Sequence, residues 1–402
     1  MTSKDKILIG LVDADLLNGG TRHPNLVLLK LAGFLTDNAI PFRLIIDKDE
    51  NIMEYTTIYM SKVFSFTPDP PFYEKVKKTP NENKFKIGGT GDYAIKKDIK
   101  DFKSSRTRDM NQLENDIFLN NYPNKRGGKK KWGIDMCRQM PYYHLYDEYI
   151  QSKIKAGRKK SYFNDYLYYS IGFLTRGCIR HCPFCVNKLE NKVYRYSELE
   201  WFLDDERNEK GDLIRPYIYL WDDNFLAAPK EIWQPMLQSL IDSKRPFQFR
   251  QGLDERILAE SEDGEEIAQM LSKCKYHGDF IFAFDNWRDR DKIIKALKIW
   301  KRHNSKRGTK FYLFCGYTLK SGEDEKLYND IKILFERIKI LMQYGCFGYV
   351  MRHADYVNHK LSNIYVQIAR WCNQPQFYRY MSFWEYCYRN QSYWEQKTKK
   401  LD

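Results

Sequence analysis

The sequence predicts an α/β protein whose largest domain is an incomplete barrel of parallel strands. From residue 167 onward, short apolar segments that suit buried strands recur with centres 31 to 47 residues apart, which leaves room for crossover helices. The six centres are Ile171, Ile218, Phe249, Ile281, Leu313 and Tyr349. We therefore expect a partial (β/α)6 barrel of the TIM type at 161–355, preceded by a small Rossmann-like domain at 1–65 and a loop-rich linker at 66–160. An aromatic-rich helical extension at 356–402 completes the expected order.

The first 65 residues alternate between strand and helix signals. Three apolar segments are expected as strands: KILIGLV (6–12), FRLII (42–46) and TTIYMSKVF (56–64). Between the first two, Pro24 is tolerated in a first helical turn, and PNLVLLKLAGFL has an apolar face. This order predicts a small Rossmann-like sheet.

The expected linker at 66–160 is rich in Lys, Asn, Gly and Pro. Its glycine cluster, KIGGTGDY (86–93), is interpreted as a turn, and close approach to a phosphate or cofactor is the alternative. We interpret Lys129, Lys130 and Lys131 as a solvated linker rather than as a loop that follows nucleic-acid phosphates.

Helix signals separate the predicted barrel strands. Ser197 and Glu200 match a capping box, Pro229 suits a first helical turn, and Pro235 is expected to kink or shorten the helix that contains it. One later helical face collects apolar side chains: Ile293, Ile294, Leu297 and Trp300. Ligands of such α/β sheets bind beyond the carboxyl ends of the strands, so residues that follow the strands are candidates for a functional site.

The segment GCIRHCPFCVNK (177–188) follows the first barrel strand and places three cysteines at Cys178, Cys182 and Cys185. A structural zinc site uses four ligands and a disulfide uses two. In a 4Fe-4S cluster, three thiolates leave one of the four irons open to a further ligand. A zinc knuckle that uses His181 is the alternative, but His181 and Cys182 are adjacent and would strain to reach one tetrahedral ion. A ferredoxin is disfavoured because no fourth cysteine is near.

At this loop the sequence resembles the radical SAM enzymes, whose cluster loop has the same spacing and an aromatic residue before the last cysteine, here Phe184. The resemblance implies that Cys178, Cys182 and Cys185 bind the cluster and that Phe184 lies beside the adenine of S-adenosylmethionine. It implies reductive cleavage of this cofactor to a 5'-deoxyadenosyl radical that abstracts hydrogen from a substrate. A reductant such as flavodoxin or ferredoxin would supply the electron.

Further candidate cofactor contacts follow the other strands. WDDNF resembles a variant found in the radical SAM branch that has an amino-terminal cobalamin-type domain; its Asp222 and Asp223 would approach the methionine amino group, and capping of the next helix is the alternative. Five residues at later strand ends have two possible roles, either contact with S-adenosylmethionine or a place in a loop salt bridge or a turn. They are Gln251, Asp254, Arg256, Asp285 and Gly316.

The resemblance covers nearly the whole chain and points to a phage and bacterial group of radical SAM proteins. Its segments are SKVFSFTP, GGTGDY, PYYHLY, FLTRGC, DDNF, QGLDER and YVMR. Where cobalamin-using relatives have Asp-x-His-x-x-Gly, this chain has Asp13, Ala14 and Asp15, and His23 has the wrong spacing. We therefore expect no cobalamin; a base-off cobalamin is the alternative.

Composition bounds the function classes. The 402 residues contain no apolar run long enough for a membrane span and begin without a secretory signal, so we expect a cytoplasmic protein with free thiols. The net charge of +14 leaves nucleic acid as an alternative partner to the expected small-molecule, nucleotide-like or peptide substrate. The rival function is a nucleic-acid-binding protein with a metal-stabilised cysteine loop. The aromatic residues of the last 45 positions are interpreted as a helical cap rather than a base-stacking surface.

Six further cysteines show no cluster spacing, so we predict no second iron-sulfur site and interpret them as core thiols. They are Cys137, Cys274, Cys315, Cys346, Cys372 and Cys387.

Overall fold

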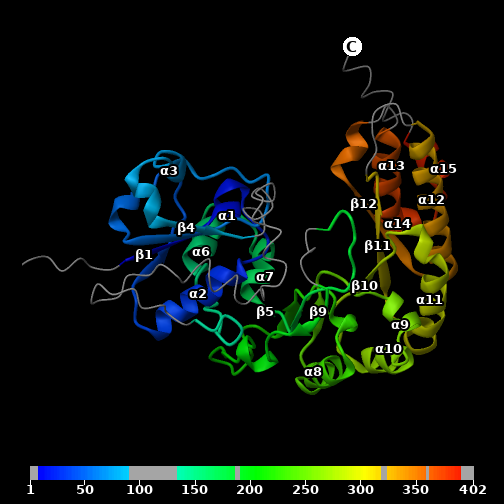
Figure 1. Cartoon of the computed structure of the whole chain (residues 1–402), viewed down its shortest axis with the longest axis horizontal. Helices are drawn as coiled ribbons and strands as arrows, with labels where there is room; N and C mark the ends of the chain where they lie inside the picture. The colour runs from blue at the N-terminus through cyan, green and yellow to red at the C-terminus, as the bar shows by residue number, and fades with distance from the viewer. Residues whose placement is uncertain (1–7, 90–133, 186–190, 318–323, 359–361, 391–402) are drawn as a thin grey trace, which may run out of the picture. The chain divides into compact units, whose positions relative to one another are not determined.

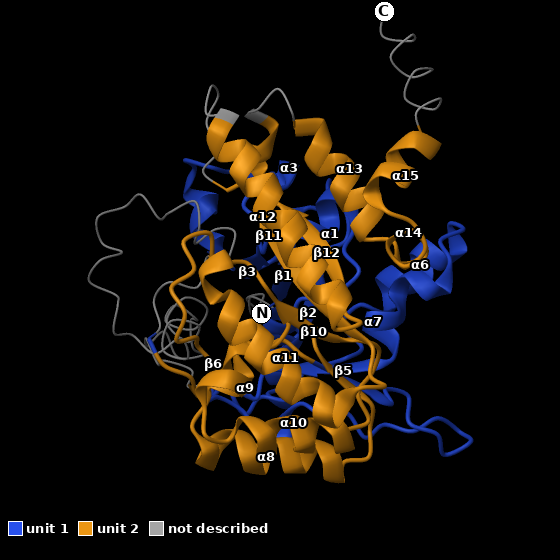
Figure 2. Ribbon diagram, turned by 90° about the vertical axis from the view of Figure 1, so that its right-hand side faces the viewer, with its two compact units in different colours: residues 1–174, 186–191, 195–219 blue, residues 175–185, 192–194, 220–402 orange. Residues whose placement is uncertain are grey.

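The computed structural model describes residues 8–89, 134–185, 191–317, 324–358 and 362–390 (Figure 1). The chain divides into two compact units (Figure 2). Unit 1 comprises residues 1–174, 186–191 and 195–219, and unit 2 comprises residues 175–185, 192–194 and 220–402. No helix in the described part of the chain combines the length and apolar character that a membrane span requires.

Unit 1 is built on a parallel sheet of order β2-β1-β3-β4. Its strands are β1 (Ile9–Asp13), β2 (Phe42–Leu44), β3 (Thr57–Ser61) and β4 (Phe85–Gly88). In register, Ile9 lies opposite both Phe42 and Thr57. Every residue of β1 and β3 is buried, as expected for central parallel strands. The three predicted strands are present, and β4 is a fourth that the linker prediction did not include.

The helices of unit 1 begin with α1 (Ala14–Gly19) and α2 (Leu26–Asp37), followed by the short helices η1 (Ile52–Glu54), α3 (Pro71–Glu74) and η2 (Pro80–Lys84). Helix α2 begins after Asn25, whose side chain accepts a hydrogen bond from the Leu28 N–H at 3.2 Å. This cap satisfies one of the N–H groups left open in the first turn.

Residues 134–167 also belong to unit 1 and differ from the expected linker. They form α6 (Asp147–Lys155), η5 (Lys160–Phe163) and α7 (Asn164–Leu167). Met136, Tyr146 and Phe163 are buried in the same apolar core as the residues of β1 and α2. The sequence of this segment predicts a linker because it contains several tyrosines. Each tyrosine ring supplies a large apolar area to the core, although its hydroxyl gives the sequence a polar character.

The six predicted barrel strands all form. They are β5 (Tyr169–Gly172), β8 (Tyr217–Leu220), β9 (Phe247–Phe249), β10 (Phe280–Ala283), β11 (Thr309–Cys315) and β12 (Phe347–Arg352). They make two three-stranded sheets of order β5-β8-β9 and β10-β11-β12, and the boundary between the units falls within β8. The second sheet is parallel, and two isolated parallel bridges, Phe247 with Tyr276 and Leu253 with Phe282, link the region of β9 to that of β10. The protein is thus of mixed α/β class with parallel sheets.

Helices alternate with the strands of unit 2. They are α8 (Lys230–Asp242), η7 (Phe225–Ala227), α9 (Arg256–Glu260), α10 (Gly264–Lys273), η8 (Trp287–Asp289), α11 (Arg290–Asn304) and α12 (Asp324–Gln343). Helix α8 begins after Pro229 and continues past Pro235, so the expected shortening does not occur. In α11, Ile293, Leu297 and Trp300 are buried as predicted.

The predicted capping box before the second barrel strand does not form. The described residues between β5 and β8 contain the short strands β6 (Thr175–Arg176) and β7 (Tyr194–Arg195) and the single turn η6 (Leu199–Trp201). The Ser197 hydroxyl donates instead to the Cys137 carbonyl oxygen at 2.7 Å. The side chain therefore has a tertiary partner that the local pattern could not reveal.

The C-terminal part consists of η9 (Ala354–Asn358), α13 (Ser362–Cys372), α14 (Pro375–Tyr378) and α15 (Phe383–Arg389). Helix α13 packs closely on β12, because a Cβ added at Gly348 would lie 2.9 Å from the Cys372 sulfur. The buried Trp371 contacts the rings of Tyr378 and Phe383. Three other rings point to solvent and are exposed by about four fifths: Tyr380, Trp384 and Tyr388.

Candidate functional site

All eleven candidate site residues belong to unit 2, and the cysteine loop is fastened to the end of the neighbouring strand β8. Asp222 is buried, and one of its carboxylate oxygens accepts from both the backbone N–H and the hydroxyl of Thr175, at 2.6 and 2.7 Å. Asp223 accepts from the Gly177 N–H at 3.0 Å. Gly177 has φ of +95°, a conformation that side-chain-bearing residues avoid. The two aspartates hold the start of the loop, and neither caps the helical turn that follows, which begins after Asn224 without a side-chain cap.

None of the three loop cysteines forms a disulfide, and all three are half-buried. The Cys178 sulfur accepts two hydrogen bonds, one from the Arg180 backbone N–H at 3.3 Å and one from the Asn224 side-chain N–H at 3.4 Å. The Cys185 N–H donates to the Cys182 carbonyl at 3.0 Å, which closes a tight turn. His181 is exposed. Within the described ranges, no group of three or more His, Cys, Asp or Glu side chains is gathered closely enough to hold a metal ion.

Burial controls the protonation of two of these thiols. It raises the pKa of Cys178, and the Asn224 hydrogen bond opposes that rise. Burial likewise raises the pKa of Cys182, and the positive charge of Arg256 opposes it. Both groups are therefore held as thiols near neutral pH, and loss of their protons needs a bound metal to stabilise the thiolate form.

Asp254 connects its own loop, after β9, with the cysteine loop and with the loop after β8. It is largely buried, and its carboxylate accepts from Arg180 at 2.7 Å, from Arg256 at 2.6 Å and from the Asn224 amide at 3.2 Å. Burial raises its pKa, but Arg256 and then Arg180 outweigh burial and hold that pKa below the ordinary value. Asp254 is thus ionised and its oxygens already serve protein donors.

The two arginines around Asp254 are also paired elsewhere. Arg256 donates to Asp289 at 2.8 Å, and Arg180 donates to Glu260 at 2.5 Å. For Asp254 and Arg256 the structure therefore shows the loop salt bridge that competed with cofactor contact in the sequence prediction. Arg180, inside the cysteine loop, was missed because its partner is 74 residues away.

An aromatic cluster brings the loop to the ends of the last strands. The centre of the Phe184 ring lies 3.9 Å from the centre of the Phe314 ring. The Tyr317 hydroxyl donates a hydrogen bond to the Pro183 carbonyl oxygen at 3.1 Å. Gly316 has φ of +73°, and a Cβ there would lie 2.8 Å from the Cβ of Tyr356. Phe184 therefore lies near the end of β11, which Gly316 follows.

Two acidic side chains lie near the ends of β9 and β10: Glu255 is buried and Asp285 is half-buried. Asp285 accepts from the Phe314 N–H at 2.9 Å, and burial raises its pKa. Glu255 accepts from the Ala283 N–H at 3.2 Å, and burial, reinforced by Asp254, raises its pKa well above the ordinary value. Its second oxygen has no hydrogen-bond partner among the described residues. Glu255 was not predicted, whereas the predicted Gln251 is exposed and forms no hydrogen bond with the described candidates.

In unit 1, the residues at and near the position of the cobalamin-binding motif make contacts within the protein. Asp13 accepts from the Leu16 N–H at 3.1 Å and from the Tyr146 hydroxyl at 2.9 Å. Asp15 accepts from the Val63 N–H at 2.6 Å, and His23 pairs with Asp165. These contacts stabilise the loop after β1.

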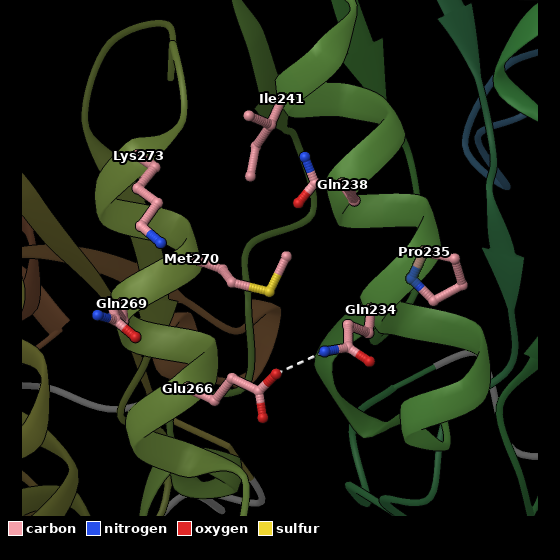
Figure 3. A pocket seen from close by; sticks show the side chains of 8 residues that line it. All are labelled: Gln234, Pro235, Gln238, Ile241, Glu266, Gln269, Met270 and Lys273. Carbon is pink, nitrogen blue, oxygen red and sulfur yellow. Dashed lines mark hydrogen bonds between the residues drawn. The ribbon is translucent and has the colours of Figure 1, made fainter.

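The remaining cysteines and one surface groove lie outside this constellation. Cys274, Cys315, Cys346 and Cys372 are buried and Cys137 and Cys387 are half-buried. A groove of about 600 Å³ separates α8 from α10 (Figure 3). It is crossed by the hydrogen bond from Gln234 to Glu266 and is lined by none of the predicted site residues.

No family model matches this chain, and no curated protein matches it significantly in sequence.

Proposed function

We propose that the protein is a radical SAM enzyme in which Cys178, Cys182 and Cys185 hold a 4Fe-4S cluster. The observation that carries the proposal is a short loop with three thiols outside any disulfide, one of which already receives two N–H donors at its sulfur. Such donors stabilise the negative charge on cluster-bound sulfur. In kind, the donor set suits the cluster, because all three donors are thiols and the loop has no fourth cysteine. The described side chains are not gathered around a single ion, so the proposal rests on the chemistry of the three thiols and on their spacing in the sequence.

We further propose that the six strands from β5 to β12 form a partial (β/α)6 barrel. In its favour, the strands follow chain order within each sheet, and parallel bridges connect β9 to β10. In such a barrel the cysteine loop and the ends of β8, β9, β10 and β11 share one face, which is where ligands of these folds bind.

When bound, the cluster would supply the electron that cleaves S-adenosylmethionine reductively. Phe184 would contact the adenine, and the backbone at Gly316 would allow its close approach. Asp222 and Asp223 would hold the start of the cysteine loop through Thr175 and Gly177. Asp254 would position Arg180 and Asn224 rather than bind the cofactor itself. A flavodoxin or ferredoxin would act as reductant in the cytoplasm, and the substrate would be a small, nucleotide-like or peptide molecule.

Anaerobic reconstitution tests the proposal. The full chain is incubated with iron and sulfide, desalted, and analysed for bound metal and for 5'-deoxyadenosine after reduction with dithionite in the presence of S-adenosylmethionine. About four irons and four sulfides per chain, with cofactor cleavage, support the proposal. One bound zinc and no cleavage would favour the rival, a metal-stabilised nucleic-acid-binding protein.

A further inference from the structure

A dense group of cations lies at the end of α6 in unit 1. Lys153 and Lys155 are in the last turn of the helix, and Arg158, Lys159 and Lys160 follow it directly. All five side chains are exposed. No acidic residue occurs between Glu148 and Asp165. Together with the exposed Arg22, these five residues are called the basic surface.

The basic surface lacks the counter-charges that several other cations of unit 1 have. Lys62 and Lys77 both pair with Asp69, and Arg43 lies near Glu50. No residue of the basic surface forms an ion pair with another described residue.

Two guanidinium groups converge on one ring. Arg158 lies 4.8 Å and Arg22 5.6 Å from the centre of the Tyr162 ring. The negative face of the ring attracts each cation and helps to fix its position. Phe163, which is buried, packs edge-on against Tyr162 and fixes it.

The backbone also holds these charges in place. Gly157 has φ of +90°, and the Arg158 N–H donates to the Lys153 carbonyl at 2.9 Å, which is the hydrogen bond of a Schellman cap. Favourable interaction with the helix dipole accounts for cations in the last turn, at Lys153 and Lys155. It does not account for Arg158, Lys159 and Lys160, which lie beyond the helix.

We propose that the basic surface binds the phosphates of a nucleic acid. Cations spread over eight successive residues suit a chain of phosphates better than a single one, and guanidinium groups match phosphate geometry. A membrane fits less well, because Ile154, 37% exposed, is the only large apolar side chain between 149 and 163 that the structure counts as exposed. The inference goes beyond the proposed enzyme activity and does not depend on it.

Fluorescence anisotropy tests the proposal with the full chain and a fluorescein-labelled single-stranded oligonucleotide of mixed sequence, over a range of KCl concentrations. The surface variant is Lys155→Gln, Lys159→Gln and Lys160→Gln. The matched control is Lys275→Gln, Lys298→Gln and Lys306→Gln, which removes the same charge from exposed positions of unit 2. Circular dichroism confirms that both variants are folded.

We expect the parent to bind with a steep salt dependence, and the surface variant to lose about 0.7 from the slope of log affinity against log salt per phosphate contact, or about 2 in total. The control should keep the parent slope. Equal losses in both variants would assign binding to net charge alone and overturn the proposal. It would also be overturned if the parent bound vesicles containing phosphatidylserine but not the oligonucleotide, or if inorganic phosphate at the same phosphate concentration displaced the oligonucleotide.

Discussion

Asn224 donates side-chain N–H bonds to both the Cys178 sulfur and the Asp254 carboxylate, at 3.4 and 3.2 Å. Its amide oxygen is buried and has no hydrogen-bond partner among the described residues. The Asn224 amide therefore connects the cysteine loop to Asp254, the carboxylate that binds Arg180 and Arg256. If the loop holds the proposed cluster, the hydrogen bond from Asn224 to the Cys178 sulfur should affect the reduction potential of that cluster.

Asn224→Ala should lower the reduction potential of the reconstituted cluster by about 20 to 60 mV, the worth of one hydrogen bond of about 0.5 to 1.5 kcal/mol for a one-electron couple. The physical reason is that an N–H donor stabilises the more negative, reduced cluster. Redox titration followed by electron paramagnetic resonance measures the shift. Asn286→Ala, which removes the cap of η8, is the control and should leave the potential unchanged. An unaltered potential in a fully loaded Asn224→Ala protein would show that this contact does not tune the cluster.

Cys182→Ala should abolish cluster binding and 5'-deoxyadenosine formation while the protein stays folded, since three thiolates are needed to hold the cluster. Cys387→Ala, at another half-buried cysteine, should retain both. Iron analysis, product chromatography and circular dichroism of the two variants decide the matter. A Cys182→Ala protein that still makes 5'-deoxyadenosine at the parent rate refutes the ligand assignment.

Asp13→Asn should flatten the pH dependence of stability. Burial raises the pKa of Asp13 from 3.8 to about 7. The folded protein therefore holds a proton that the unfolded chain releases, so the contribution of Asp13 is fully present below pH 4 and is lost as pH rises through 7. The parent should lose about 1.4 kcal/mol per pH unit in this window relative to the variant.

Urea unfolding at several pH values gives this difference. Asp49→Asn is the control, because Asp49 is exposed. Parallel stability curves for the parent and Asp13→Asn would mean that Asp13 is ionised in the folded protein at neutral pH.

Gly316→Ala should destabilise the protein more than Gly345→Ala does. Both glycines have positive φ, so each substitution costs about 1 to 2 kcal/mol of backbone strain. A Cβ at Gly345 meets open space, whereas a Cβ at Gly316 lies 2.8 Å from Tyr356 and adds a steric cost. Thermal unfolding of the two variants checks the order, and equal losses would indicate that Tyr356 moves aside freely.

The sequence predicted the six strands β5, β8, β9, β10, β11 and β12 because each is an apolar segment bounded by polar residues, a pattern that burial on both faces imposes. The folded part of the expected linker escaped prediction because several of its core residues are tyrosines, such as Tyr146 and Tyr149, and lysines follow them closely in the sequence.

The hydrogen bonds of the site could not be read from local pattern. Asp254 and Arg256 are close in sequence, but their importance depends on Arg180 and Asp289, which folding brings near. Asn224 is part of the WDDNF segment, yet nothing in that segment indicates that its amide reaches a sulfur. Pairings between distant residues depend on the order of the strands, which a single sequence does not encode in its periodicity.

The outward orientation of Trp384 on α15 has a spectroscopic consequence. This indole is 79% exposed, whereas Trp233, Trp300 and Trp371 are buried. Acrylamide should quench its red-shifted emission more strongly than the emission of these three buried indoles, which lies at shorter wavelength. A molecule that covers α15 would shield Trp384 from the quencher, so the native chain carries its own optical probe for contacts at that helix.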